Sequence, residues 1–275
     1  MLEVLVILFV VGCSCGLIGS VLVVRNQSML ADALSHSVLL GIVLGFLISQ
    51  NLDSPLLLLG AAIFGLLTIV AIDGLHTRKL AQDAATGLLF TFFFAIAVIL
   101  ISLFARNVHL DMDMVLMGEV LFAPLNRIDL LGISLPLALV KSVGLLLVLV
   151  VFFFLNFQPL KFYLLDKEQA KLQGIRTRPL ELSLLFLVSL TTVLSFEVVG
   201  SMTVIVFLLA PSMAALPWSK HFFQFLVFGQ CFAILTVFLG FLCASWFDLT
   251  MSGTCAVLSL VMVCLSTLVK NTLKI

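Results

Sequence analysis

Long apolar runs follow one another along the whole chain, separated by short polar segments. Each run is near the length that an α-helix needs to cross a hydrocarbon core about 30 Å thick. The pattern therefore predicts an all-α, polytopic transmembrane bundle that forms a single domain over residues 1–275. We expect nine spans, or eight if the division near 196–199 is wrong, at roughly 4–24, 30–48, 54–72, 86–105, 129–156, 181–196, 199–216, 221–245 and 252–270.

Composition supports this interpretation and excludes other classes of protein. The chain is 63% hydrophobic and only 10% charged, which is more apolar than a soluble domain can be. Its 14 basic and 14 acidic residues cancel, so it lacks the positive charge of a nucleic-acid-binding protein. Its cysteines all fall inside apolar runs without a CxxC pair, which favours packing over disulfides or zinc ligation: Cys13, Cys15, Cys231, Cys243, Cys255 and Cys264.

The distribution of basic residues predicts the orientation of the spans. With the N-terminus outside and the C-terminus cytoplasmic, only Arg106 and Arg127 lie in an outer loop. Lys141 falls within the fifth span, and we expect its side chain to extend outward to the interface. The other basic residues then lie on the inner side, as the positive-inside rule requires: Arg25, Arg78, Lys79, Lys161, Lys167, Lys171, Arg176, Arg178, Lys220, Lys270 and Lys274.

Small residues and prolines punctuate the spans. The pairs Gly12/Gly16 and Gly41/Gly45 have the spacing that lets membrane helices approach closely. Pro211 and Pro217 are expected to break or end helices near the inner face, because proline lacks the N–H that an interior helical position donates.

The segment LADALSHSVLLG, residues 30–41, carries the most distinctive polar residues. Asp32 and His36 are four residues apart, so they share one face of a helix. An ionisable residue inside a membrane helix is costly and by default marks a substrate or ion pathway. A carboxylate oxygen with an imidazole nitrogen suits a divalent first-row metal ion. The alternative is an Asp–His hydrogen bond that packs two helices.

Two connecting loops are long. The outer loop, 106–128, carries His109, Asp111 and Asp113 in alternation, which fits either a metal site on an extended segment or, more often, an ordinary solvated loop. The inner loop, about 157–180, contains DKEQAKLQG at 166–174 and predicts a short polar helix stopped by glycine. Such a helix outside the membrane needs either a protein partner or a lipid headgroup surface, and a soluble protein subunit fits well.

Several activities are excluded by missing motifs. The chain has no GxxxxGK[ST] motif, so it does not hydrolyse ATP by a P-loop. It has no HExxH or GxSxG motif either, which argues against metalloprotease and serine hydrolase chemistry. The classes that remain are a transport subunit driven by a separate ATPase, an ion-coupled secondary carrier, and a membrane enzyme of unfamiliar type.

Five segments together resemble a known family. Glu168, Ala170 and Gly174 form E-x-A-x-x-x-G, which looks like the loop by which importer permeases dock on their ATPase. Together with the Asp32/His36 segment, the chain resembles the permeases of manganese/zinc/iron ATP-binding-cassette importers over nearly its whole length. Beyond LADALSHSVLLG after Arg25, the matching segments are DAATGLLF (83–90), DMDMVLMGEVL (111–121), DKEQAKLQG (166–174) and VGSMTVIVFLLAPSMAA (199–215).

The resemblance implies specific roles for residues and partners. Asp32 and His36 would bind the transported Mn, Zn or Fe ion, and Asp166, Glu168, Ala170 and Gly174 would dock the ATPase. The expected partners are a cytoplasmic ATP-binding-cassette ATPase, an extracytoplasmic metal-binding protein and a second permease subunit, identical or paralogous. No permanently bound cofactor is expected, and the expected location is the bacterial plasma membrane.

This sequence departs from the family at two positions. Leu40 stands where proline is frequent, and Asp83 stands where glutamate is frequent. Neither position belongs to the ligand pair, although the first could change helix bending near it. Two alternatives stay open: a permease of the related siderophore or cobalamin importers, and a secondary carrier that uses Asp32 as a proton site.

Overall fold

The computed structural model describes the chain except for residues 52–53, 76–80, 105–119, 122, 131–132 and 274–275. Within that part, nine helices are long and apolar enough to cross a membrane, which confirms the predicted polytopic helical bundle. These helices are α1 (Leu2–Val24), α2 (Met29–Ser49), α3 (Pro55–Leu75), α4 (Gln82–Phe104), α6 (Leu137–Leu155), α9 (Thr177–Val199), α10 (Ser201–Ala215), α11 (Phe222–Phe247) and α12 (Met251–Leu273).

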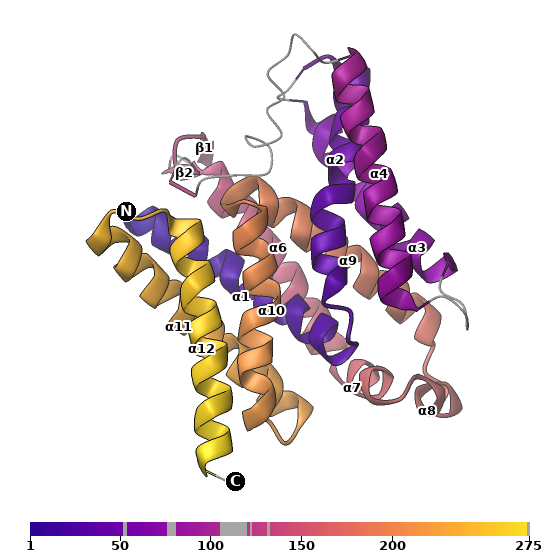
Figure 1. The fold of residues 1–275 in the computed structure, drawn as a ribbon, viewed down its shortest axis with the longest axis vertical. Coiled ribbons are helices and arrows are strands. Elements are labelled where there is room, and N and C mark those ends of the chain that lie inside the picture. Colours follow the sequence, from indigo (N-terminus) through magenta and orange to yellow (C-terminus); the bar gives the residue numbers. More distant parts are fainter. Residues whose placement is uncertain (52–53, 76–80, 105–119, 122, 131–132, 274–275) are drawn as a thin grey trace.

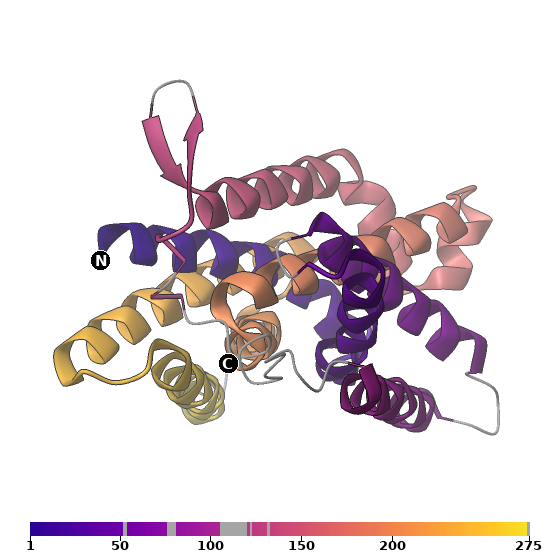
Figure 2. The ribbon, with the colours of Figure 1, turned by 90° about the horizontal axis from the view of Figure 1, so that it is seen from above.

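The helices pack in two groups that α9 connects (Figures 1 and 2). Helix α1 packs against α6, α10 and α11, while α12 covers α10 and α11. Helix α2 packs against α3 and α4. Helix α9 contacts α1, α6 and α10 in the first group and α2 and α3 in the second. A residue on α9 is therefore placed to touch both groups.

Close approach of α2 and α3 depends on glycine, as the sequence predicts. A Cβ added to Gly41 would collide with the carbonyl oxygen of Gly60, and one added to Gly45 would collide with that of Leu56. Because these obstacles are backbone atoms, no side-chain rotation could relieve the overlap. The position of α2 is consequently well defined by its neighbour.

The sixth and seventh spans are separated by a single residue. Gly200, with φ 79° and ψ 159°, lies between the end of α9 at Val199 and the start of α10 at Ser201. This backbone conformation is essentially restricted to glycine.

The two prolines behave differently. The prediction that Pro211 breaks or ends a helix is wrong, since Pro211 lies inside α10 without ending it. Pro217 lies in the short 3₁₀ helix η1, Leu216–Trp218, which follows α10.

The fifth predicted span begins too early, because a β-hairpin precedes the helix. Strands β1 (Arg127–Leu130) and β2 (Ile133–Pro136) pair antiparallel, with Arg127 opposite Pro136. Figure 2 shows this hairpin projecting from the bundle. Lys141 consequently lies near the start of α6. Its Nζ is 2.6 Å from Oε1 of Glu197, so Lys141 forms an ion pair with a residue of α9. Apolar residues alternating over a short run before Pro136 are the signal for these strands.

The cysteines are unpaired, in agreement with the sequence prediction. All six are free, and Cys13, Cys15 and Cys255 are buried among the helices. A buried thiol behaves as a small apolar side chain. Cys231 and Cys264 are exposed on α11 and α12, so these two contribute nothing to the core.

Candidate functional site

Asp32 and His36 lie at the beginning of α2. Asp32 is in the first turn of the helix and His36 follows one turn later, with Nε2 3.7 Å from Asp32 Oδ1. This distance is too long for a hydrogen bond, which would need about 2.7–3.2 Å. Both residues belong to α2, so the pair does not hydrogen-bond one helix to another. Two ligands bound to one ion at about 2.1 Å lie roughly 3–3.5 Å apart, so a small adjustment lets both contact a metal.

Two phenylalanines of α4 hold the imidazole of His36. The ring of Phe90 stacks on it at 5.7 Å between centroids, and Phe94 meets it edge-on at 5.2 Å. The Nδ1 atom of His36 is buried and has no hydrogen-bond partner in the described part of the chain. The two phenylalanine rings hold the imidazole in an orientation in which Nε2 faces Asp32. Sequence reasoning missed Phe90 and Phe94, although their i, i+4 spacing on one helical face was a usable signal.

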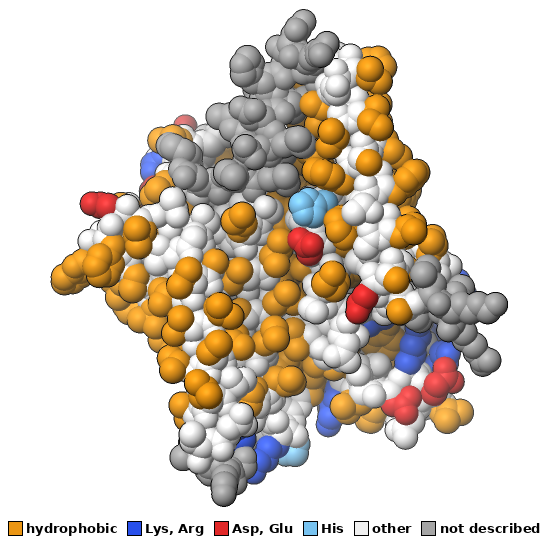
Figure 3. Space-filling model, viewed as in Figure 1, with side chains coloured by type: hydrophobic (Ala, Val, Ile, Leu, Met, Phe, Trp, Pro, Cys, Tyr) orange, Lys and Arg blue, Asp and Glu red, His pale blue; other side chains and the backbone are white. Residues whose placement is uncertain are grey.

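Asp32 and His36 are accessible at the surface of the chain. The side chains of Asp32 and His36 are 45% and 38% exposed. In Figure 3, the face over α2, α4, α10 and α12 is mostly apolar, with an acidic and a histidine side chain together near its middle. No group of three or more His, Cys, Asp or Glu residues that could hold a metal occurs among the described residues.

Ser35 lies between Asp32 and His36 on α2, but its hydroxyl is already used within the helix. The hydroxyl of Ser35, between the two ligands, donates to the carbonyl oxygen of Asp32 at 2.6 Å. Ser35 is therefore committed to its own helix. The weaker candidates His109, Asp111 and Asp113 lie outside the described residues and stay predictions.

The inner-loop segment forms the predicted short helix. Helix α7 (Phe157–Leu165) leads into α8 (Lys167–Leu172). The carboxylate of Asp166 accepts from the backbone N–H groups of Glu168 and Gln169 at 2.9 and 3.2 Å, which is an N-cap.

Gly174 ends the same helix. It adopts φ 78°, and the N–H of Ile175 donates to the carbonyl of Ala170, while the N–H of Gly174 donates to that of Lys171. These two bonds form a Schellman motif, which requires a left-handed residue. The glycine stop predicted from the sequence is confirmed.

Helix α8 has a buried side and an exposed side. Ala170 is fully buried against the rest of the chain. On the opposite side, the Glu168 side chain is 81% exposed and pairs with Lys171 at 3.0 Å. Leu172, the last residue of α8, is also strongly exposed, and so is Leu165 at the end of α7. Figure 1 shows α8 and the C-terminus toward one end of the molecule, and the N-terminus and hairpin toward the other.

Comparison with known proteins establishes the family. The sequence model of the family described as "ABC 3 transport family" matches residues 1–271 of this chain. The chain belongs to the ABC 3 transport family. This confirms the family predicted from the sequence and, with the helices described above, makes the chain a multi-pass membrane permease.

Two relatives and one solved structure illustrate the similarity. The manganese transport system membrane protein MntD of Bacillus subtilis is 38% identical over 250 residues, which cover 90% of this chain and 85% of MntD. The zinc transport system membrane protein TroD of Treponema pallidum is 40% identical over 211 residues, covering 76% of this chain and 58% of TroD. Among solved structures, PsaBC from Streptococcus pneumoniae in complex with Fab aligns with a TM-score of 0.77 at 22% identity, over 96% of this chain and 89% of that chain. The last comparison supports the fold.

Proposed function

We propose that this chain is the membrane permease subunit of an ATP-driven importer of divalent transition-metal ions, namely Mn, Zn or Fe. The observation that carries the proposal is the Asp32/His36 pair, whose facing nitrogen and oxygen are 3.7 Å apart on an exposed part of α2. The relatives named for manganese and zinc transport support the class of substrate. One Asp and one His accept each of these metals, so the pair leaves the choice among them open.

A second permease subunit, identical or paralogous, would complete the site. One chain offers two ligands in its described part, whereas Mn, Zn and Fe take four or more. Half-exposed ligands within an apolar face are suited to meeting the same surface of a partner subunit. Two such pairs would enclose the ion between the subunits and shield it from lipid.

Each residue would have a distinct role in transfer. Asp32 would supply negative charge that offsets the lost hydration of the ion, and His36 would supply a nitrogen ligand oriented by Phe90 and Phe94. A permeation site must release its ion, so binding at this pair should be moderate rather than tight.

Helix α8 would dock on the cytoplasmic ATPase. Its capped ends, buried Ala170 and exposed Glu168 support a rigid projection that presents one face to a partner. We call α8 the docking helix below. ATP hydrolysis by the ATPase would change its position, and an extracytoplasmic metal-binding protein would deliver the ion at the opposite end of the bundle.

The proposed function predicts metal uptake that depends on the ATPase. We expect cells that express this permease with its co-encoded ATPase and binding protein to accumulate radiolabelled Mn, Zn or Fe. Replacing the P-loop lysine of the ATPase should reduce accumulation to the level of cells without the permease, because transport then lacks its energy source. Uptake that persists would favour a secondary carrier, and uptake of chelated iron alone would favour a siderophore permease.

The orientation of the spans predicts which end is accessible from outside. A cysteine at Asp129, exposed on the hairpin, should react with an impermeant thiol reagent added to intact cells, whereas one at Lys171 should react only after permeabilisation. The parent chain is the control, because its six native cysteines lie in α1, α11 and α12. The reverse labelling pattern would refute the N-out topology.

A further inference from the structure

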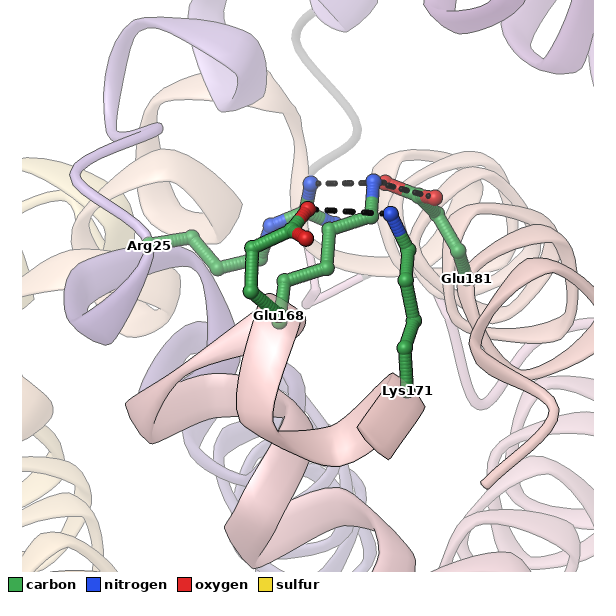
Figure 4. Close-up of polar contacts among 5 residues, drawn as sticks. Arg25, Glu168, Lys171 and Glu181 are labelled. Atoms are coloured by element: carbon green, nitrogen blue, oxygen red, sulfur yellow. Dashed lines mark hydrogen bonds and ion pairs between the residues drawn. The ribbon is translucent and has the colours of Figure 1, made fainter. Parts of the chain in front are cut away.

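Glu181 joins three separate parts of the chain on the docking-helix side of the bundle. Its side chain is only 11% exposed. Oε1 accepts from Arg25 Nη2 at 3.1 Å, and Lys167 Nζ donates to Oε1 at 2.9 Å and to Oε2 at 2.8 Å. Figure 4 shows Arg25 and Glu181 extending toward one another beside the docking helix. Hydrogen bonds between charged groups are strong when they are shielded from water.

The three residues come from different structural elements. Arg25 caps the C-terminus of α1, Lys167 is the first residue of the docking helix, and Glu181 lies near the start of α9. The ring of Tyr163 on α7 completes the cluster, with Arg25 Cζ at 5.4 Å and Lys167 Nζ at 5.9 Å from its centroid. Burial raises the pKa of Tyr163, so its ring stays neutral and attracts both cations. We call these four residues the Glu181 cluster.

A rigid turn connects this cluster to the metal-binding pair. Asn26 adopts φ 55°, its N–H donates to the carbonyl of Val23, and the N–H of Gln27 donates to that of Leu22 at 2.9 Å. This is a Schellman turn directly after Arg25. Helix α2 begins at Met29, three residues after Asn26, and carries Asp32 in its first turn. Because this connection is short and hydrogen-bonded, a displacement of Arg25 should also displace the start of α2.

The attachment of the docking helix gives the cluster its mechanical importance. This helix packs on α7 and α9, and its buried contact is the small side chain of Ala170. The bond from Lys167 to Glu181 is thus the charged link between the docking helix and the membrane helices. The other ion pair of the docking helix, Glu168–Lys171, is exposed and stays within that helix. An exposed pair of this kind contributes little to stability.

We propose that Glu181 is a positioning residue that couples the docking helix to the α1–α2 turn, so that movement of the docking helix repositions Asp32 and His36. This inference rests on the proposed function. Arg25 and Lys167 both donate to the carboxylate of Glu181, and α9, which carries Glu181, contacts both groups of helices. When the ATPase moves the docking helix, Lys167 pulls on Glu181, and Arg25 follows the same carboxylate. The motion reaches α2 through the turn at Asn26.

Glu181→Gln tests this coupling, with Glu197→Gln as the matched control. Both residues lie on α9 and both pair with a lysine, but Glu197 bonds Lys141, far from the docking helix. The readout is the amount of metal transported per ATP hydrolysed by the purified permease–ATPase complex in vesicles. We expect this ratio to fall at least about fivefold for Glu181→Gln, the lower end of typical couplings between sites. Basal hydrolysis and the amount of bound ATPase should stay at the wild-type level, and Glu197→Gln should leave the ratio unchanged.

Two further variants keep the test independent of folding. Lys167→Gln removes the charged link from a side chain that is 46% exposed, so it leaves no buried charge unpaired and should also lower the ratio. Glu181→Asp keeps the carboxylate, so its ratio of metal transported to ATP hydrolysed should lie between those of Glu181→Gln and the wild type. An unchanged ratio in Glu181→Gln and Lys167→Gln, or loss of the ATPase from either complex, would overturn the coupling role. Failure of the proposed function would look different, because the wild-type complex itself would then transport no metal.

Discussion

We expect Asp32→Asn to lower metal uptake at least about tenfold while the chain stays folded in the membrane at its normal level. The amide keeps the shape of the side chain but lacks the negative charge that compensates an ion for its lost hydration. Folding should be unaffected, because the Asp32 side chain is 45% exposed and its Oδ1 is too far from His36 Nε2 for a hydrogen bond. Loss of a group that only orients a metal ligand costs 10–100-fold in affinity, so loss of a ligand itself should lower uptake at least about tenfold.

His36→Gln should have the same effect for a different reason. Glutamine preserves polarity and some length but removes the imidazole that Phe90 and Phe94 orient. The measurement is accumulation of radiolabelled Mn or Zn in cells with matched amounts of each variant. Ser37→Ala, on the same helix, is the control, since within the described part of the chain the Ser37 hydroxyl bonds the carbonyl of Leu34 in its own helix. Near-normal uptake by both Asp32→Asn and His36→Gln would leave the pair without a role in transport.

Gly174→Val should release the ATPase from an otherwise folded permease. Gly174 has φ 78°, and an added Cβ would meet no atom within 4 Å, so the penalty comes from the backbone alone. A β-branched residue in this conformation costs about 1–2 kcal/mol or more. The Schellman motif would open, and the docking helix would lose the end that presents Glu168. Co-purification of the ATPase with the permease measures the effect.

Two substitutions separate conformation from side-chain size. Gly174→Asn should retain the ATPase, because asparagine tolerates the left-handed conformation. Gly144→Ala on α6 also places a Cβ in open space, but within a regular helix, and should change nothing. If Gly174→Val still co-purifies with the ATPase and supports full transport, this end of α8 is not part of the docking surface.

Features governed by local geometry could be predicted from the sequence. Apolar length determines a membrane span, and a spacing of four places Asp32 and His36 on one helical face whatever surrounds them. Likewise, Asp166 before the polar segment and Gly174 after it predict a capped short helix, because both caps bond only backbone groups within a few residues. The strands Arg127–Leu130 and Ile133–Pro136 were missed because their alternation covers only four residues each and runs directly into the long apolar segment of α6.

Contacts between distant residues were decided only by the tertiary structure. Arg25 and Glu181 are 156 positions apart, and no periodicity in either segment marks them as partners. Phe90 and Phe94 meet His36 only because α4 packs on α2, an arrangement that depends on how closely the neighbouring helix backbones approach. In both cases the helices are defined by short-range bonds, whereas their mutual rotation and depth are set by side-chain packing over the whole bundle. The Asp32/His36 pair was therefore visible in the sequence, while the contacts of Phe90 and Phe94 with His36 and of Arg25 with Glu181 emerged only from the fold.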